Sequence, residues 1–159
     1  MVVELASIIG QPVFNNQGQK LGKVRSLAVD QKGILAGLVI KSGLVELSAL
    51  PYEKITDFTS NNLVTSLERL DKASELIKIQ QRAGLVLGLP AFTESRKALG
   101  KVQDLYLDVA TGQIIRYYLR SLLQEQIIPE DLVSALTPKA VVFKDEVLTP
   151  VARPDTAKD

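Results

Sequence analysis

The strongest constraint on the fold is that one pattern of residues occurs twice in the chain. The segment Gly10-Gln-Pro-Val-Phe14 recurs as Gly88-Leu-Pro-Ala-Phe92, 78 residues later (88 − 10). At the same offset, Leu21-Gly22-Lys23-Val24 recurs as Leu99-Gly100-Lys101-Val102, and nine of the 21 residues from 10 to 30 have an identical counterpart. The repeat predicts two copies of one structural unit of roughly 70 residues, related by internal duplication.

Each copy is predicted to contain a β-hairpin preceded by a short strand. The hairpin turn begins with Asp, which bonds its own backbone, and ends at Gly, which is free to take a positive φ. Val and Leu are frequent on both sides of this turn, as is typical of strands. The expected strands are Val13–Phe14, Lys23–Asp30 and Ile34–Ile40 in the first copy, and Ala91–Phe92, Lys101–Val109 and Gln113–Leu119 in the second.

The expected fold class is mainly β, with two small antiparallel β-barrels joined by a linker helix. Short strands in so small a unit favour closure, because a closed barrel has no exposed edges. Helical spacing of apolar residues predicts a helix over Leu67–Ala83, with Gly84 as its stop, and a short helix is expected to begin at Pro129. The predicted division is a first barrel at 5–66, a helical linker at 67–84, a second barrel at 85–148 and a flexible tail at 149–159.

A unit of this size is marginal alone, because it buries only about 60% of its unfolded surface. We therefore expect the two barrels to pack on each other. Whether they face each other or splay around the helix stays open.

Composition excludes several kinds of catalysis. The chain has no histidine and no cysteine, so it has no thiolate nucleophile, no disulfide, no Ser-His-Asp triad and no His or Cys metal ligand. Lys and Arg number 19 against 18 Asp and Glu, which gives a net charge of +1. This balance is not that of a basic DNA-binding module. We expect no enzyme activity, no cofactor, no metal and no direct DNA partner.

The chain is expected to be soluble and cytoplasmic. Its start, Met1-Val-Val-Glu-Leu5, lacks the cationic region of a secretory signal. The longest apolar run, Ile34–Ile40, is far shorter than the roughly 20 residues that a membrane span needs. Contact with a membrane is therefore expected only through a partner.

The repeated pattern resembles the PRC-barrel family. Both copies have Gly-x-Pro-(Val/Ala)-Phe, then Leu-Gly-Lys-Val-x-x-Leu-x-x-Asp, then Gly and a hydrophobic strand. The second copy departs from the pattern where Glu94-Ser-Arg-Lys97 replaces the glycine-containing turn Asn15-Asn-Gln-Gly18. Tandem barrels of this kind are similar to cyanobacterial proteins. The resemblance implies an adaptor, since relatives in photosynthetic reaction centres and in a ribosome-maturation factor dock on other proteins.

The candidate site is a strip of three residues in the second copy, Arg116, Tyr118 and Arg120. On a strand these side chains share one face, whereas Tyr117, Leu119 and Ile115 are expected to line the interior. Tyr and Arg are frequent at the centres of protein interfaces, and the same strip could stack a nucleobase. An ordinary solvated face is the third interpretation, and the sequence leaves all three open.

Other motifs have structural interpretations. Gly22 and Gly100 open strands and indicate bulges or close backbone approaches, and Asp30 and Asp108 are expected to form turns. The leucines of Leu44-Val-Glu-Leu47 and of Leu122-Leu123 would extend a docking patch if exposed, although such residues more often belong to the core.

Three functions follow as hypotheses. The first is a non-enzymatic adaptor or assembly protein that docks on a larger protein complex, such as one of the photosynthetic apparatus. The second is an RNA-associated assembly factor acting on ribosomes. The third is an enzyme or proton-relay element that uses Tyr, Lys and carboxylates.

Overall fold

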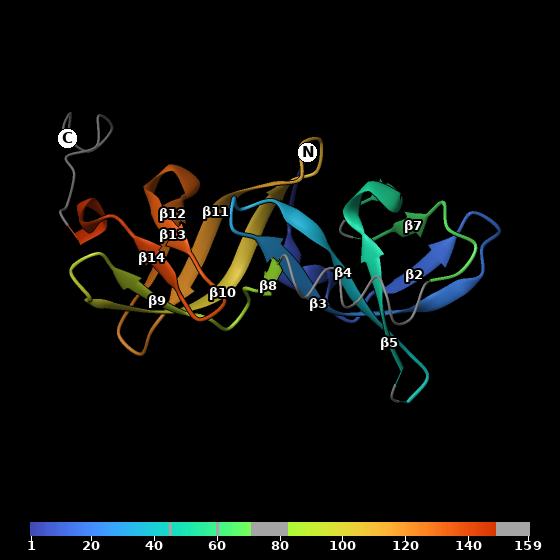
Figure 1. Cartoon of the computed structure of the whole chain (residues 1–159), viewed down its shortest axis with the longest axis horizontal. Coiled ribbons are helices and arrows are strands. Elements are labelled where there is room, and N and C mark those ends of the chain that lie inside the picture. The colour runs from blue at the N-terminus through green and yellow to red at the C-terminus, as the bar shows by residue number, and fades with distance from the viewer. Residues whose placement is uncertain (45, 60, 71–82, 149–159) are drawn as a thin grey trace.

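The chain forms two seven-stranded sheets that lie next to each other along its long axis (Figure 1). The structure is a computed structural model that describes residues 1–44, 46–59, 61–70 and 83–148. The prediction of a mainly β fold is confirmed, since the described segments are strands joined by turns and short 3-10 helices.

The two sheets have corresponding strand orders. The first follows the order β5 (Glu46–Pro51), β4 (Leu35–Ser42), β3 (Lys20–Asp30), β2 (Pro12–Asn15), β7 (Leu63–Thr65) and β6 (Ile55–Phe58). The second follows β12 (Glu125–Pro129), β11 (Gln113–Arg120), β10 (Ala98–Asp108), β9 (Pro90–Thr93), β14 (Val141–Phe143) and β13 (Val133–Leu136).

The prediction of closed barrels is wrong. Among the described residues, β5 does not pair with β6 and β12 does not pair with β13. Pro51 and Pro129 end β5 and β12, and each is followed by a 3-10 helix, η2 (Tyr52–Lys54) or η3 (Glu130–Leu132). Proline lacks the N–H that continues a ladder, so the chain leaves the sheet before the end strands meet. The short helix expected at Pro129 is this 3-10 turn.

The two predicted hairpins are present as β3–β4 and β10–β11. One detail of the second hairpin differs from the prediction. The pairing passes from Tyr106–Arg116 to Leu107–Ile114, so Ile115 is an extra residue in β11. Such a bulge shifts the alternation of side chains. Ile114 is therefore the buried residue, and the expectation that Ile115 faces the interior is wrong.

The linker helix is not found where residues are described. The segment 67–70 is irregular, and Ala83–Leu85 forms strand β8. Gly84 pairs with Val29 in that strand, so the expectation that it ends a helix is wrong. The rest of the predicted helix, 71–82, and the predicted tail, 149–159, lie outside the described residues.

The two sheets exchange their first strands. Strand β1 (Val2–Glu4) pairs with β10 in the second sheet, and β8 pairs with β3 in the first. Where the hairpin turns meet, the Leu35 amide donates to the Gly112 carbonyl (2.8 Å) and the Ile114 amide donates to the Gly33 carbonyl (2.9 Å). The expectation that the two units pack on each other is confirmed by these contacts.

One hydrophobic core runs through both sheets. It contains inward side chains of the first sheet, such as Leu27 and Leu38, and of the second, such as Leu105 and Phe143. Tyr117 packs edge-on against Phe143, with 5.7 Å between ring centroids. Each fully buried side chain of this size contributes about 1.5–3 kcal/mol to stability. Because buried side chains of both sheets belong to the same core, neither sheet is an independent layer.

Candidate functional site

The strip of three predicted residues lies on the outer face of β11. Arg116 and Arg120 are exposed and Tyr118 is half-buried, while Tyr117 and Leu119 between them are completely buried. This alternation follows from the period of two along a strand. The strip is therefore accessible to a partner, and it is anchored from behind by two core residues.

Arg116 is held against an aromatic ring of the neighbouring strand. Tyr106 of β10 stands directly opposite Arg116, and the guanidinium carbon lies 5.7 Å from the centre of the tyrosine ring. A cation over an aromatic face is attracted by the electrons of the ring, which is worth about 0.5–1 kcal/mol at an exposed site. Tyr106 therefore extends the strip and restricts the conformations of Arg116.

Glu125 of β12 stands directly opposite Arg120, the last residue of the strip. Its Oε1 is 3.6 Å from Nε of Arg120, and both side chains are largely exposed. The interaction of the Tyr118 hydroxyl with the Glu125 carboxylate is the main cause that raises the pKa of Tyr118. Glu125 thus compensates part of the cationic charge of the strip.

The strip continues into an apolar residue. Ile127 of β12 stands directly opposite Tyr118, and its side chain is 54% exposed. On the other side of Tyr118 is Asp104, which is buried, and its Oδ1 accepts hydrogen bonds from the amides of Ala6 (2.8 Å) and Leu105 (2.7 Å). Asp104 therefore attaches the 3-10 helix η1 (Leu5–Ile8) to β10 and is not a free carboxylate of the patch.

The first sheet has no corresponding patch at the aligned positions. Gly37 and Val39 are buried there, and Val39 stands opposite Ser26 and Ala49. Lys41 is the counterpart of Arg120, so this row keeps one cation, but it offers no aromatic ring and no second cation. The outer face of the second sheet is therefore chemically distinct from that of the first.

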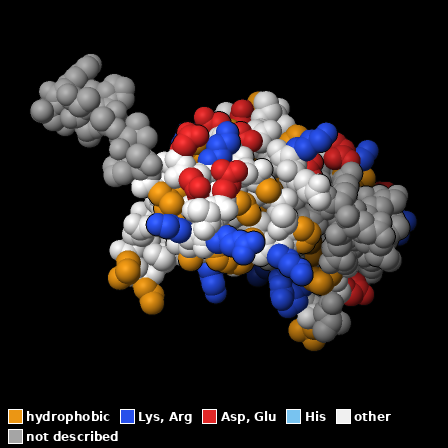
Figure 2. Space-filling model, turned by 60° about the vertical axis from the view of Figure 1, so that its left-hand side comes forward, with side chains coloured by type: hydrophobic (Ala, Val, Ile, Leu, Met, Phe, Trp, Pro, Cys, Tyr) orange, Lys and Arg blue, Asp and Glu red, His pale blue; other side chains and the backbone are white. Residues whose placement is uncertain are grey.

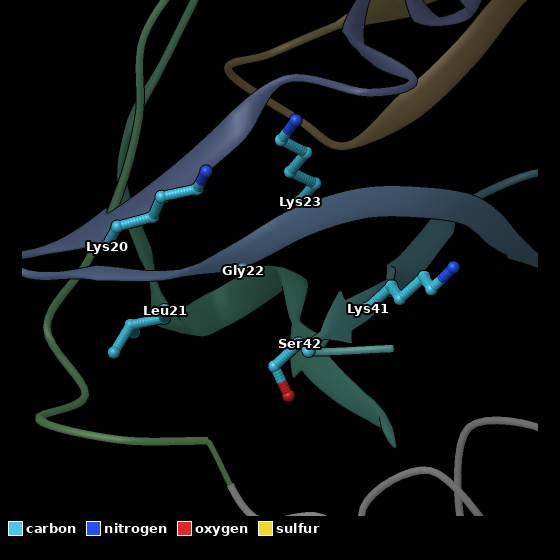
Figure 3. A pocket seen from close by; sticks show the side chains of 7 residues that line it. Lys20, Leu21, Gly22, Lys23, Lys41 and Ser42 are labelled. Carbon is cyan, nitrogen blue, oxygen red and sulfur yellow. The ribbon is translucent and has the colours of Figure 1, made fainter. Parts of the chain in front are cut away.

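A surface pocket of about 470 Å³ lies over the first sheet. It is lined by Lys20, Leu21, Gly22, Lys23, Lys41, Ser42 and Gly43. Figure 3 shows that the side chains of Lys20 and Lys23 extend to one side of the β3 ribbon, whereas Lys41 extends in another direction. Because the three ammonium groups do not converge, the pocket forms a diffuse cationic surface rather than a chelating site for one small anion.

The repeated glycines and aspartates have the structural roles predicted for them. A Cβ on Gly22 would come within 2.7 Å of the Lys41 carbonyl oxygen, and one on Gly100 would overlap the Arg120 carbonyl oxygen. Oδ1 of Asp30 accepts from the amides of Lys32 and Ile34. Oδ1 of Asp108 accepts from the amide of Ala110.

The leucines at the two outer hairpin tips are exposed, contrary to their usual place in a core. Leu44 lies between β4 and β5 with 89% of its surface exposed, and Leu122 and Leu123 between β11 and β12 are fully exposed. These three leucines follow the last ladder pairs of their hairpins, Ser42–Glu46 and Arg120–Glu125.

Sequence reasoning missed three members of the patch: Tyr106, Glu125 and Ile127. Tyr106 was missed because counting back from the turn at Asp108 places it opposite Ile115, and only the bulge brings it opposite Arg116. Glu125 and Ile127 belong to β12, which the sequence did not reveal as a strand.

The comparison with protein families identifies a PRC-barrel domain in the first part of the chain. The model of that family matches residues 1–69, which include β2 to β7 of the first sheet and β1, which pairs with β10 in the second sheet. No curated protein matches the chain. None of the described helices is long and apolar enough to cross a membrane.

Proposed function

We propose that the chain is a non-enzymatic adaptor that docks on a larger protein complex through the outer face of its second sheet. The observation that carries this proposal is the patch formed by Arg116, Tyr118, Arg120, Tyr106 and Ile127. It combines two cations, two aromatic rings and an exposed aliphatic side chain, which is the composition of interface centres.

The residues of the patch are arranged in advance of binding. Arg116 is held over the Tyr106 ring, and Arg120 is paired with Glu125. A partner therefore orders fewer free side chains, and each long side chain that is already restrained saves about 0.5–1.5 kcal/mol. The partner is expected to present carboxylates or carbonyl oxygens that accept from the two guanidinium groups.

The proposal includes a second PRC-like unit. Residues 85–148 are proposed to be a duplicate of the matched PRC-barrel domain, with the two units forming a tandem. The repeat at an offset of 78 residues (88 − 10) and the corresponding strand orders of the two sheets support this. An adaptor of the photosynthetic apparatus is the specific form that we propose, on the resemblance of the tandem to cyanobacterial proteins.

The test is a tagged capture from the lysate of the host, with membrane and soluble fractions identified separately by mass spectrometry. The double variant Arg116→Ala and Tyr118→Ala is expected to lose the partner that the unchanged protein retains. Arg25→Ala is the control, because Arg25 is an exposed arginine on β3 of the other sheet. Retention of the same partner by the double variant would contradict the assigned surface. Salt-sensitive capture of ribosomal proteins would favour a ribosome-associated factor instead.

A further inference from the structure

The two outer hairpins end in exposed leucines. The connection between β11 and β12 carries Leu122 and Leu123, with exposed fractions of 104% and 95%, and the connection between β4 and β5 carries Leu44, with 89%. Single exposed apolar residues are common on protein surfaces. Here three lie at the extreme ends of two hairpins, where no described neighbour covers them.

A pair of cations precedes each of these tips. Lys23 stands directly opposite Lys41 in the first sheet, and Lys101 stands directly opposite Arg120 in the second. Like charges directly opposite each other on neighbouring strands are destabilising. An anionic surface brought against the tips would remove this repulsion.

The cationic charge is less compensated in the first sheet. Glu125 lies 3.6 Å from Arg120, whereas Lys23 and Lys41 make no ion pair with a carboxylate among the described residues. The Lys23–Lys41 pair is therefore expected to carry more of the electrostatic attraction than Arg120.

Both tips project from the same edge of the molecule. The β4–β5 and β11–β12 hairpins extend downward on opposite sides of the centre in Figure 1. Figure 2 shows apolar side chains protruding at two places along the lower edge, with Lys and Arg side chains between them. A flat surface can therefore contact the two leucine tips and the intervening cations at the same time.

We propose that this edge binds directly to the surface of an anionic lipid bilayer. The leucines of the two tips insert at the boundary between headgroups and acyl chains, and the cations at the base of each tip face lipid phosphates. Apolar insertion together with cationic attraction is the combination that holds peripheral proteins on membranes. Because the net charge of the chain is only +1, attraction to an anionic bilayer depends on the local clustering of the cations at this edge.

This inference goes beyond the proposed function and rests on different residues, except for Arg120. It also departs from the expectation that the chain reaches a membrane only through a partner. A bilayer at the tips leaves Arg116, Tyr118 and Tyr106, which lie further along β10 and β11 from the tip, available for a protein.

The test is co-sedimentation of the full chain with lipid vesicles at low salt. Vesicles of phosphatidylcholine with phosphatidylglycerol are expected to bind the protein, whereas vesicles of phosphatidylcholine alone are not. Leu122→Ser together with Leu123→Ser is expected to weaken binding to the anionic vesicles about tenfold. The control is Leu122→Ile with Leu123→Ile, which keeps the apolar surface. Because both side chains are fully exposed, neither variant is expected to change the melting temperature.

The cations have a test of their own in the same assay. Lys23→Gln together with Lys41→Gln is expected to weaken binding at least about tenfold, since each lysine near an anionic surface contributes about 1 kcal/mol. Lys32→Gln is the control, because Lys32 lies in the turn at the opposite end of the same hairpin. Added salt is expected to release the unchanged protein.

Two results would overturn the inference. One is failure of the unchanged protein to sediment with anionic vesicles at low salt. The other is equal binding by the Leu122→Ser and Leu123→Ser variant, since adsorption would then need no insertion. If the protein does not bind anionic vesicles while capture of its protein partner still depends on Arg116 and Tyr118, the adaptor proposal stands. The leucine tips would then contact the protein partner and not a bilayer.

Discussion

Arg96 takes the same backbone conformation in the β9–β10 turn that Gly18 takes in the β2–β3 turn. The φ angles are 71° and 80°, and the two residues are separated by the repeat offset, 96 − 18 = 78. The closing contacts also correspond, because the Arg96 amide donates to the Thr93 carbonyl and the Gly18 amide donates to the Asn15 carbonyl. The departure of the second copy from the glycine pattern therefore leaves the turn unchanged and places an arginine in a left-handed conformation.

This relationship predicts that Arg96→Gly stabilises the protein. A residue other than glycine in the left-handed region costs about 1 kcal/mol, and the exposed Arg96 side chain contributes little in return. Thermal unfolding of Arg96→Gly should show a melting temperature higher by a few degrees. The reciprocal change, Gly18→Arg, should lower it. A lower melting temperature for Arg96→Gly would contradict the shared turn geometry.

A second prediction concerns Gly100. Its φ is 109°, and a Cβ at this position would overlap the carbonyl of Arg120 in the neighbouring strand. Gly100→Ala should therefore destabilise the protein by about 3 kcal/mol, measured by denaturant unfolding. Gly88→Ala is the matched control. Gly88 has a φ of 89° with open space around it, so its cost should be about 1 kcal/mol. Equal costs would show that β10 and β11 are not in close approach at Gly100.

A third prediction concerns the buried Tyr117 hydroxyl. It has no hydrogen-bond partner among the described residues, and burial is the main cause that raises the pKa of Tyr117. Leaving such a group without a partner is costly. Tyr117→Phe, which keeps the ring against Phe143, should therefore be stabilising by up to about 1 kcal/mol in denaturant unfolding.

The same residue predicts a dependence of stability on alkaline pH. The unfolded chain releases the Tyr117 proton near pH 10, about the ordinary value for tyrosine, whereas the raised pKa keeps it bound in the folded protein. The stability that this proton binding contributes is present below the pKa of Tyr117 in the unfolded chain. It is lost as the pH rises toward the pKa of Tyr117 in the folded protein. The free energy of unfolding should fall less above pH 10 in Tyr117→Phe than in the unchanged protein. Identical pH profiles would mean that Tyr117 reaches solvent.

The exchanged strands predict that the matched domain does not fold fully alone. A fragment of residues 1–70 lacks β8, which pairs with Ala28, Val29 and Asp30 of β3, and leaves β1 without its partner β10. Such a fragment should unfold with low cooperativity in thermal circular dichroism, and addition of the remaining chain, residues 71–159, should restore a cooperative transition. A cooperative transition of the fragment alone, at the melting temperature of the whole chain, would contradict the exchange.

Local features of the fold could be predicted from the sequence. The turns at Asp30 and Asp108 depend on a side chain bonding its own backbone, which is a property of neighbouring residues. The alternation of side chains between the two faces of β11 could also be predicted, because it depends on neighbouring residues only. It concerns Arg116, Tyr117, Tyr118 and Leu119.

The features that could not be predicted depend on distant parts of the chain. Strand β8 comprises only Ala83–Leu85, and its pairing with β3 has no local signal. The bulge at Ile115 arises from the register against β10, which alternation alone cannot show. Glu125 was missed because its role depends on where β12 returns beside β11. The candidate site was thus predicted as a strip on one strand, and the structure widened it across three.

The central claim is that the outer face of β10, β11 and β12 is the docking surface. The most direct measurement is amide hydrogen exchange of the full chain, free and bound to the complex captured from lysate. We expect slower exchange on binding in the segments 98–108 and 113–129, with little change in the outer strands β6 and β7 of the first sheet. Slower exchange confined to the first sheet, or no change in either sheet, would contradict the claim.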